Sequence, residues 1–259
     1  MDNRPIGIFD SGVGGLTVAR QIMAAMPQKR MVYFGDSLRA PYGSRQPEEL
    51  VRFSRQIIDF LMTKDIGALV VACGTISATV FDEIKQMVDI PIMGMLDAAV
   101  DAAVDTTKTG RIGLIATAGT VASRAHEKAI LAKQPDAELV GIPCPLFVPL
   151  AEEGWLDNDV AKLTAQAYLK NLGQSGIDTL ILGCTHYPLL IESIKAALPA
   201  NISIIDPAVR LAQDLAAMID SAGESAPQHE FYASGNKDKF DEMSYIALGK
   251  SYNAKVVVL

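Results

Sequence analysis

The sequence predicts an α/β protein with two pseudo-symmetric, doubly wound parallel-sheet domains. Short apolar runs bounded by glycine or proline alternate with amphipathic segments, as in chains of β-α-β units. The pattern then restarts, because Ile112-Gly113-Leu114-Ile115 resembles Ile6-Gly7-Ile8-Phe9. Each half also contains an apolar run that ends in a cysteine, 67 positions after Ile6 at Cys73 and 72 positions after Ile112 at Cys184. This near-equal spacing indicates two related halves.

Composition limits the class of function. The chain has 259 residues, of which 49% are hydrophobic and 20% are charged, as in an ordinary globular protein. A net charge of −7 argues against a nucleic-acid or anionic-membrane partner, which would need clustered lysine and arginine. The chain enters a strand without an apolar leader and has no run of membrane-spanning length, so we expect a cytoplasmic protein. Its three cysteines are expected to be free thiols in that reducing compartment.

The first expected strand, 6–9, leads into a glycine-rich turn over 10–17 and a helix with apolar residues at helical spacing. Such a turn directs backbone N–H groups at a carboxylate or phosphate, although packing alone also explains its glycines. The turn lacks the Gly-Lys-Ser/Thr of a Walker A loop. Dinucleotide binding remains a competing interpretation, because Asp36 follows the second strand, 31–34, where a ribose-binding acid is expected, although Thr17 replaces the third glycine.

The remaining elements continue the alternation. Pro47 and the acids after it begin a helix, because proline suits the first turn and acids face the helix dipole. Further strands are expected at 69–72, 92–94, 111–116, 138–142, 180–183, 202–205 and 256–258, with an edge strand at 231–233. Further helices are expected at 77–87, 96–107, 159–172, 188–198 and 237–248, with another from 207. We assign residues 1–95 and 207–259 to the first domain and 96–206 to the second, with the ligand site in the cleft between them.

The two strand-end cysteines are the main catalytic candidates. Ligands of open α/β sheets bind at the carboxyl ends of strands, so Cys73 and Cys184 are expected to line the cleft. Each precedes a helix, whose N–H groups and dipole lower the pKa of a thiol. Two facing thiols suit a reaction in which one thiolate removes a proton from a carbon and the other thiol delivers a proton to the opposite face. A disulfide between them is an alternative that a reducing compartment disfavours, whereas Cys144 is interpreted as an inert buried thiol.

Other polar residues follow the same strand ends. His186 is interpreted as an acid/base or thiol-polarising partner of Cys184, the alternative being a histidine hydrogen-bonded for structure. Asp10 either caps the glycine turn, binds an ammonium group or tunes Cys73, while Glu152 taken alone is a surface acid. The threonines at 75, 117, 120 and 185 are N-caps by default. Neither cysteine has a CxxC partner and no lysine stands at a strand mouth, so we expect no metal and no Schiff-base cofactor.

Five separated stretches, in order, resemble the glutamate racemases of the cofactor-independent aspartate/glutamate racemase superfamily. They are 10–17, 40–43, 73–75, 117–120 and 182–190. The resemblance covers nearly the whole chain. It implies interconversion of L- and D-glutamate without a cofactor, supply of D-glutamate for peptidoglycan, two α/β domains around the site, and a homodimer.

The resemblance also implies residue roles. Cys73 and Cys184 are the implied catalytic pair, assisted by Asp10 near Cys73 and by Glu152 and His186 near Cys184. The substrate-binding candidates are Asp10, Ser11, Pro41, Tyr42, Gly43, Gly74, Thr75, Thr117, Thr120 and Thr185. The family usually has Cys-Asn-Thr where this chain has Cys73-Gly74-Thr75, and losing the amide's hydrogen bond is expected to cost about 1.5–3 kcal/mol of binding. Both thiols remain, so we expect activity to survive.

Three other functions stay open at this point. One is racemisation of a related acidic amino acid such as aspartate. Another is a non-catalytic binding or inhibitory protein on the same scaffold, which Gly74 makes more credible. A Cys-His hydrolase would leave the second strand-end thiol unexplained.

Overall fold

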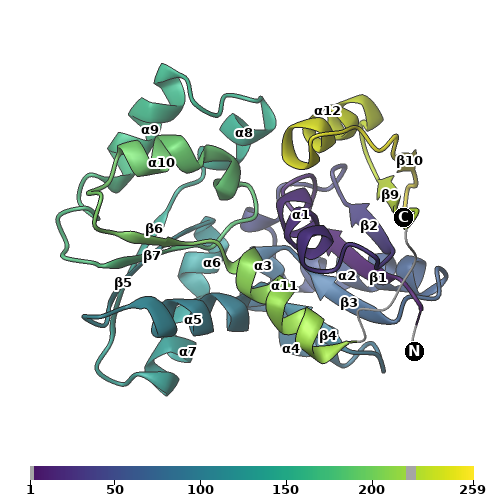
Figure 1. Ribbon diagram of the computed structural model, residues 1–259, viewed down its shortest axis with the longest axis horizontal. Coiled ribbons are helices and arrows are strands. Elements are labelled where there is room, and N and C mark those ends of the chain that lie inside the picture. Colours follow the sequence, from purple (N-terminus) through teal and green to yellow (C-terminus); the bar gives the residue numbers. More distant parts are fainter. Residues whose placement is uncertain (1–2, 220–225) are drawn as a thin grey trace.

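The computed structural model describes residues 3–219 and 226–259, in which two parallel sheets lie side by side (Figure 1). The first sheet has the strand order β10-β9-β2-β1-β3-β4 and the second has the order β6-β5-β7-β8. All of these strand pairs are parallel. The strands are β1 (Ile6–Asp10), β2 (Met31–Gly35), β3 (Ala68–Val71), β4 (Ile92–Gly94), β5 (Arg111–Ala116), β6 (Glu138–Pro143), β7 (Thr179–Leu182), β8 (Ser203–Ile205), β9 (Glu230–Ala233) and β10 (Lys255–Val256).

Helices cover both faces of the two sheets, and the strands β1, β2, β3 and β7 are fully buried, as is usual in parallel sheets. Around the second sheet, Figure 1 shows α5 and α7 on one side and α9 and α10 on the other, while α11 packs against α1 and α5 near the middle of the molecule. The α-helices are α1 (Leu16–Ala25), α2 (Pro47–Met62), α3 (Gly74–Thr79), α4 (Phe81–Lys85), α5 (Met95–Thr106), α6 (Ala118–Ser123), α7 (Ala125–Lys133), α8 (Phe147–Glu152), α9 (Asp159–Leu169), α10 (Ile191–Ala196), α11 (Pro207–Met218) and α12 (Lys237–Leu248).

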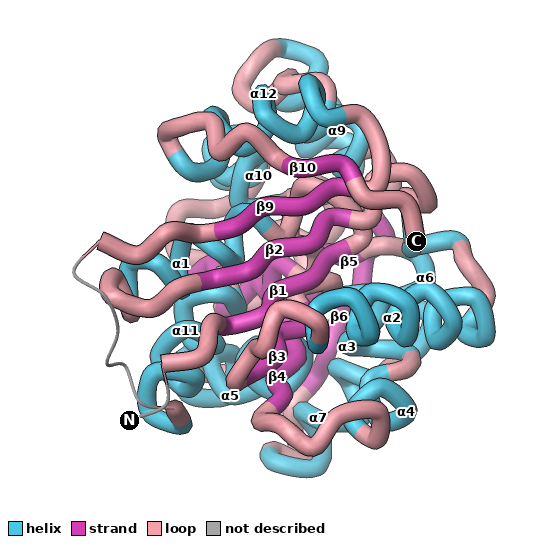
Figure 2. Tube along the Cα trace, turned by 90° about the vertical axis from the view of Figure 1, so that its right-hand side faces the viewer, coloured by secondary structure: helices cyan, strands magenta, loops and turns pink. Residues whose placement is uncertain are grey.

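The two sheets repeat one arrangement. The order β2-β1-β3-β4 in the first sheet matches β6-β5-β7-β8 in the second, so β3 and β7 occupy equivalent places. The first sheet is longer, because β9 and β10 from the C-terminal part of the chain extend it, as the succession of strands in Figure 2 shows. This repeat confirms the predicted fold class of two doubly wound α/β units.

Each sheet separates two apolar cores, because side chains alternate across a strand. On β1, Ile6 and Ile8 join one core and Phe9 joins the other. On β7, Leu180 and Leu182 face one core of the second sheet, and the intervening isoleucine faces the other. These fully buried strands hold their carboxyl ends in fixed positions, and those ends carry the candidate residues.

Several predicted elements differ from the structure. The strand at 231–233 was expected at a sheet edge, but β9 lies between β2 and β10, because the last short strand pairs with it. The helix expected at 77–87 begins earlier, at Gly74, and is interrupted at Val80, whose φ of −135° leaves the helical region. A 3₁₀ turn over Tyr187–Leu190 precedes α10, so that helix begins later than predicted. Helix α8 is not among the helices predicted from the sequence.

Candidate active site

Cys73 and Cys184 follow the equivalent strands β3 and β7. Strand β3 ends at Val71, and Cys73 is the N-cap of α3, while Cys184 comes two residues after β7. Both are free thiols that are nearly closed off from solvent, with exposed fractions of 4% and 8%. The segments that carry them are in contact, because a Cβ placed on Gly74, next to Cys73, would lie 3.9 Å from the Cys184 Cα. The fold therefore brings the two sequence-predicted thiols together.

Asp10, fully buried at the end of β1, organises the glycine turn. Its Oδ1 accepts hydrogen bonds from the backbone N–H groups of Gly12 at 3.2 Å and Gly15 at 3.0 Å. Its Oδ2 lies 3.5 Å from the Thr185 hydroxyl, which belongs to the second sheet's side of the site. The turn therefore directs its N–H groups at a carboxylate of its own chain, and Asp10 caps it, as one of the sequence interpretations proposed.

The surroundings of Cys73 hold its thiol in the neutral form. Burial and the nearby Asp10 carboxylate raise the pKa of Cys73 to about 12, and hydrogen bonds from the Ile76 backbone and the Ser11 side chain only partly oppose this. The prediction that the pKa of Cys73 is lowered was wrong, although the Ile76 N–H of the following helix does act in the predicted direction. Helix α3 has only six residues, and the cost of burying a thiolate beside a carboxylate outweighs its N-terminal N–H groups.

Cys184 has a basic partner instead. The His186 Nδ1 atom lies 3.8 Å from the Cys184 sulfur, and its Nε2 lies 3.0 Å from Oε1 of Glu152. Burial lowers the pKa of His186, but the hydrogen bonds to Cys184 and Glu152 outweigh burial and raise this pKa to about 10. His186 is therefore an imidazolium at neutral pH. Burial raises the pKa of Glu152, but the hydrogen bond to His186 and the charge of His186 outweigh burial and lower this pKa.

Three predicted threonines form a hydroxyl cluster that crosses between the two sheet units. Thr75 from α3 lies 3.0 Å, oxygen to oxygen, from Thr117, which in turn lies 3.0 Å from Thr120. Thr117 is also the N-cap of α6, as predicted, since its hydroxyl accepts a hydrogen bond from the Thr120 N–H at 3.3 Å. These hydroxyls offer donors and acceptors to a small polar ligand.

A cavity of about 440 Å³ opens beside this cluster. Its lining includes the predicted residues Pro41, Gly43, Thr117 and Glu152. The volume suits a small-molecule ligand.

Tyr42 does not direct its side chain to the cleft. It is 1% exposed and packs against Phe53, and its hydroxyl donates a hydrogen bond to Asp36. Asp36 is fully buried and also accepts hydrogen bonds from Arg39 at 2.6 Å and Ser234 at 2.7 Å. Asp36 therefore anchors the loop that carries Pro41 and Gly43, and it is not available to a ribose, which removes the dinucleotide interpretation.

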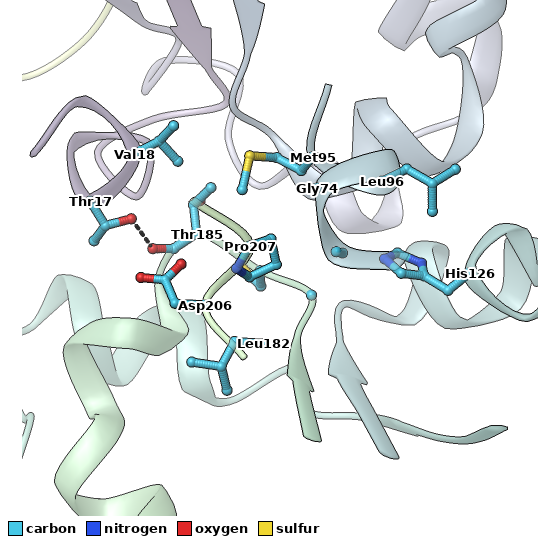
Figure 3. A pocket seen from close by; sticks show the side chains of 13 residues that line it. Thr17, Val18, Gly74, Met95, Leu96, His126, Leu182, Thr185, Asp206 and Pro207 are labelled. Carbon is cyan, nitrogen blue, oxygen red and sulfur yellow. Dashed lines mark hydrogen bonds between the residues drawn. The ribbon is translucent and has the colours of Figure 1, made fainter. Parts of the chain in front are cut away.

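Two contacts at the site had no predicted role. The Thr17 hydroxyl donates to the Thr185 carbonyl at 2.9 Å, as Figure 3 shows, and thus joins α1 to the segment after β7. A Cβ placed on Gly14 would lie 2.4 Å from His186 Nδ1. The glycine turn therefore serves close packing against His186 as well as the Asp10 cap. The sequence signal for these two contacts was that Gly14 and Thr17 belong to the glycine-rich turn over 10–17.

Two further features concern the described residues. No group of three or more histidine, cysteine, aspartate or glutamate side chains in residues 3–219 and 226–259 is arranged to hold a metal ion. Within the same ranges, every helix is too short or too polar to cross a membrane.

Comparison with known proteins identifies the family. A model of the Asp/Glu/hydantoin racemase family matches residues 16–215. The chain belongs to the Asp/Glu/hydantoin racemase family. A glutamate racemase of Geobacter metallireducens from this family is 48% identical over 216 residues, which cover 83% of this chain and 80% of the relative. A glutamate racemase of Streptococcus gordonii is 39% identical over the full length of both chains.

Solved racemases share the whole architecture. The crystal structure of a glutamate racemase from Bacillus anthracis matches with a TM-score of 0.96 at 35% identity, over 100% of this chain and 99% of that one. A glutamate racemase from Francisella tularensis in complex with D-glutamate matches with a TM-score of 0.92 at 33% identity, over 99% and 98% of the two chains. This agreement confirms the resemblance of the chain to glutamate racemases.

Proposed function

We propose that this chain is a glutamate racemase that interconverts L- and D-glutamate by two-thiol proton transfer at Cα. The observation that carries the proposal is the pair of buried thiols on equivalent strands of the two sheets, each with its own titratable partner. Full-length similarity to glutamate racemases supports glutamate as the substrate.

In the proposed reaction, one cysteine acts as a thiolate and the other as a thiol. The thiolate forms an S–H bond as the Cα–H bond breaks, which leaves a carbanion at Cα. The other cysteine then gives its proton to the opposite face of Cα and becomes the thiolate. No proton is gained or lost overall, and the two sulfurs exchange protonation states.

Partner residues hold the charges that this cycle needs. The imidazolium of His186, held by Glu152, attracts negative charge at the Cys184 sulfur. We assign Asp10 to the Cys73 side of the cycle, as the group that accepts a hydrogen bond from the substrate ammonium. We assign substrate contacts to Ser11, Gly74 and the threonine hydroxyls at 75, 117, 120 and 185, and to the backbone of the 41–43 loop.

The wider assignments are also proposals. Strand β4 belongs to the first sheet and ends at Gly94, and the next four strands, β5 to β8, form the second sheet, which ends at Ile205. This order of strands supports domain boundaries after residues 95 and 206. Free thiols support a reducing cytoplasmic location, and the product would supply D-glutamate for peptidoglycan. We also propose a homodimer, for which light scattering should give twice the chain mass of 27.7 kDa.

Circular dichroism tests the activity directly. Purified protein without any added cofactor should remove the signal of D-glutamate and, in a second sample, that of L-glutamate, until both reach the racemic mixture. Aspartate serves as the matched control substrate and should turn over more slowly. A D-glutamate signal that stays constant contradicts the proposal, and faster turnover of aspartate contradicts the choice of substrate.

A further inference from the structure

The segment that carries Cys184 and His186 is a tight turn closed by its own backbone. The Tyr187 N–H donates to the Cys184 carbonyl at 3.1 Å, and the Leu189 N–H donates to the His186 carbonyl at 3.1 Å. Each donor lies three positions after its acceptor, as in a 3₁₀ helix. This short ladder of hydrogen bonds sets where the His186 ring stands relative to the Cys184 sulfur.

The ladder has a gap at Thr185. The residue three positions after Thr185 is Pro188, which has no backbone N–H to donate. Thr185 is only 6% exposed, and a buried carbonyl without a donor is unfavourable. The donor comes from the first sheet unit instead, because the Thr17 hydroxyl lies 2.9 Å from the Thr185 carbonyl oxygen (Figure 3).

The Thr17 hydroxyl has one hydrogen and two acceptors within reach. Its oxygen lies 2.9 Å from the Gly14 carbonyl oxygen and 2.9 Å from that of Thr185. The Gly14 carbonyl already accepts a hydrogen bond from the backbone N–H of Thr17 at 3.0 Å, so it is satisfied without the hydroxyl. The hydroxyl hydrogen is therefore assigned to the Thr185 carbonyl.

Helix α1 gives this hydroxyl a rigid support. Thr17 is fully buried, and its neighbours Leu16 and Val18 belong to an apolar core of the first sheet. The turn before α1 reaches the same segment, since a Cβ placed on Gly14 would lie 2.4 Å from His186 Nδ1. The start of α1 thus contacts the Cys184 side of the site through one hydrogen bond and one close packing contact.

We infer that Thr17 is a positioning residue, whose hydroxyl replaces the donor that Pro188 lacks and thereby holds His186 in place against Cys184. Without the hydroxyl, the carbonyl between these two residues loses its donor and the turn relaxes. The contact of 3.8 Å between His186 Nδ1 and the Cys184 sulfur is then weakened. For its turnover readout, the inference rests on the proposed racemase function; its titration readout does not.

The groups around His186 make its titration a reporter of this position. Cys184 and Glu152 bond to its two ring nitrogens, the Asp10 carboxylate interacts with its charge, and Lys239 acts in turn on Glu152. Of these, only the bond to Cys184 lies within the turn that the hydroxyl holds. Loss of the hydroxyl should therefore lower the pKa of His186 from about 10 while the bond to Glu152 remains.

The test compares Thr17→Val, which keeps the shape of the side chain without its hydroxyl, with Thr17→Ser, which keeps the hydroxyl. NMR titration of labelled histidine, with the His186 signal assigned from His186→Asn, should show a lowered pKa of His186 in Thr17→Val and no change in Thr17→Ser. The kcat for glutamate should fall about tenfold in Thr17→Val, less than the loss expected for a misplacement of about 1 Å, and KM should change little.

Two further variants isolate the missing donor. Pro188→Ala provides a backbone N–H that can donate to the Thr185 carbonyl, so adding it to Thr17→Val should restore most of the lost turnover and raise the pKa of His186 again. Thr164→Val is the matched control, because the Thr164 hydroxyl donates to the Val160 carbonyl at 2.7 Å within α9. Both readouts in this control should equal those of the unmodified protein.

Each outcome decides the matter. If Thr17→Val does not fold, Thr17→Ala removes the same hydroxyl and takes its place. An unchanged pKa of His186 in the folded variant overturns the inference, as does an equal loss in Thr17→Ser. No recovery in the double variant also overturns it, because the hydroxyl would then not be replacing the donor that Pro188 lacks. A lowered pKa of His186 in a protein without racemase activity supports the inference and rejects only the function.

Discussion

Cys73 and Cys184 end equivalent strands of the two sheets, yet their surroundings are electrically opposite. Cys73 is buried beside the carboxylate of Asp10, which together with burial raises its pKa to about 12. Cys184 lies 3.8 Å from His186, an imidazolium at neutral pH that is itself held by Glu152. The repeated fold supplies matching positions for two sulfurs, and the side chains beside them carry opposite charges.

This difference has a consequence for catalysis. In each direction of racemisation one sulfur takes a proton while the other gives one, and these roles exchange when the direction reverses. Pairs of titratable groups whose surroundings push their proton affinities apart are typical of acid/base sites.

The largest effect is expected when either sulfur is removed. Cys73→Ser or Cys184→Ser should each lower kcat by about 10²- to 10⁴-fold, because one face of Cα then lacks its acid/base group. Steady-state racemisation of each enantiomer measures this. Cys144→Ala is the matched control and should keep full turnover. Substantial turnover in either serine variant would contradict a role for both thiols.

A smaller loss is expected when the imidazolium is removed. His186→Asn should lower kcat by about 10²-fold and Glu152→Gln by less, since Glu152 acts through His186. A greater loss of activity in Glu152→Gln than in His186→Asn would show that Glu152 does not act through His186.

The Cys73 side should respond to a change of charge at Asp10. Asp10→Asn keeps an oxygen for the Gly12 and Gly15 N–H groups but removes the negative charge that raises the pKa of Cys73. The Cys73 pKa should therefore fall, and its rate of iodoacetamide labelling above pH 8 should rise. The Cys144 rate serves as the internal control. If the pH dependence of Cys73 labelling is the same in Asp10→Asn and in the unmodified protein, burial alone sets this pKa.

The smallest effect concerns stability and pH. The pKa of His186 is raised from its ordinary value of 6.5 to about 10, so its stabilising contribution is complete below pH 6.5 and is lost as the pH rises through about 10. The difference in free energy of unfolding between the unmodified protein and His186→Asn should therefore narrow from pH 7 to pH 10. Urea unfolding at several pH values measures it. A difference that widens over this range would mean that His186 is neutral in the folded protein.

The sequence predicted those features of the fold that depend on local pattern. Buried parallel strands read as short apolar runs, so β3 and β7 and the cysteines after them were found at the right places. The interior position of β9 was not found, because it depends on pairing with two residues at 255–256 that the local pattern does not encode. The same holds for Val80, where a single backbone conformation divides one expected helix into two.

The electrostatics of the candidate site were not predicted from the sequence. A helix after Cys73 indicated a lowered pKa, whereas burial and Asp10, from a strand 63 positions earlier, raise it. Gly74 is the sharper case. From the sequence it is a lost amide, but in the structure it is a close backbone contact, since a Cβ there would lie 2.5 Å from the Gly183 carbonyl oxygen. The pKa of Cys73 and the space beside Gly74 both depend on segments that are far apart in the sequence and close together in the fold.

In the proposed mechanism, two different sulfurs serve the two faces of Cα. Racemisation of protiated D-glutamate in D₂O, stopped within the first turnovers, distinguishes two bases from one. The L-glutamate formed should carry deuterium at Cα, delivered by the second, solvent-exchanged thiol, while the remaining D-glutamate keeps its proton. L-glutamate that retains the substrate's own proton would show that a single base serves both faces, and it would contradict the two-thiol mechanism.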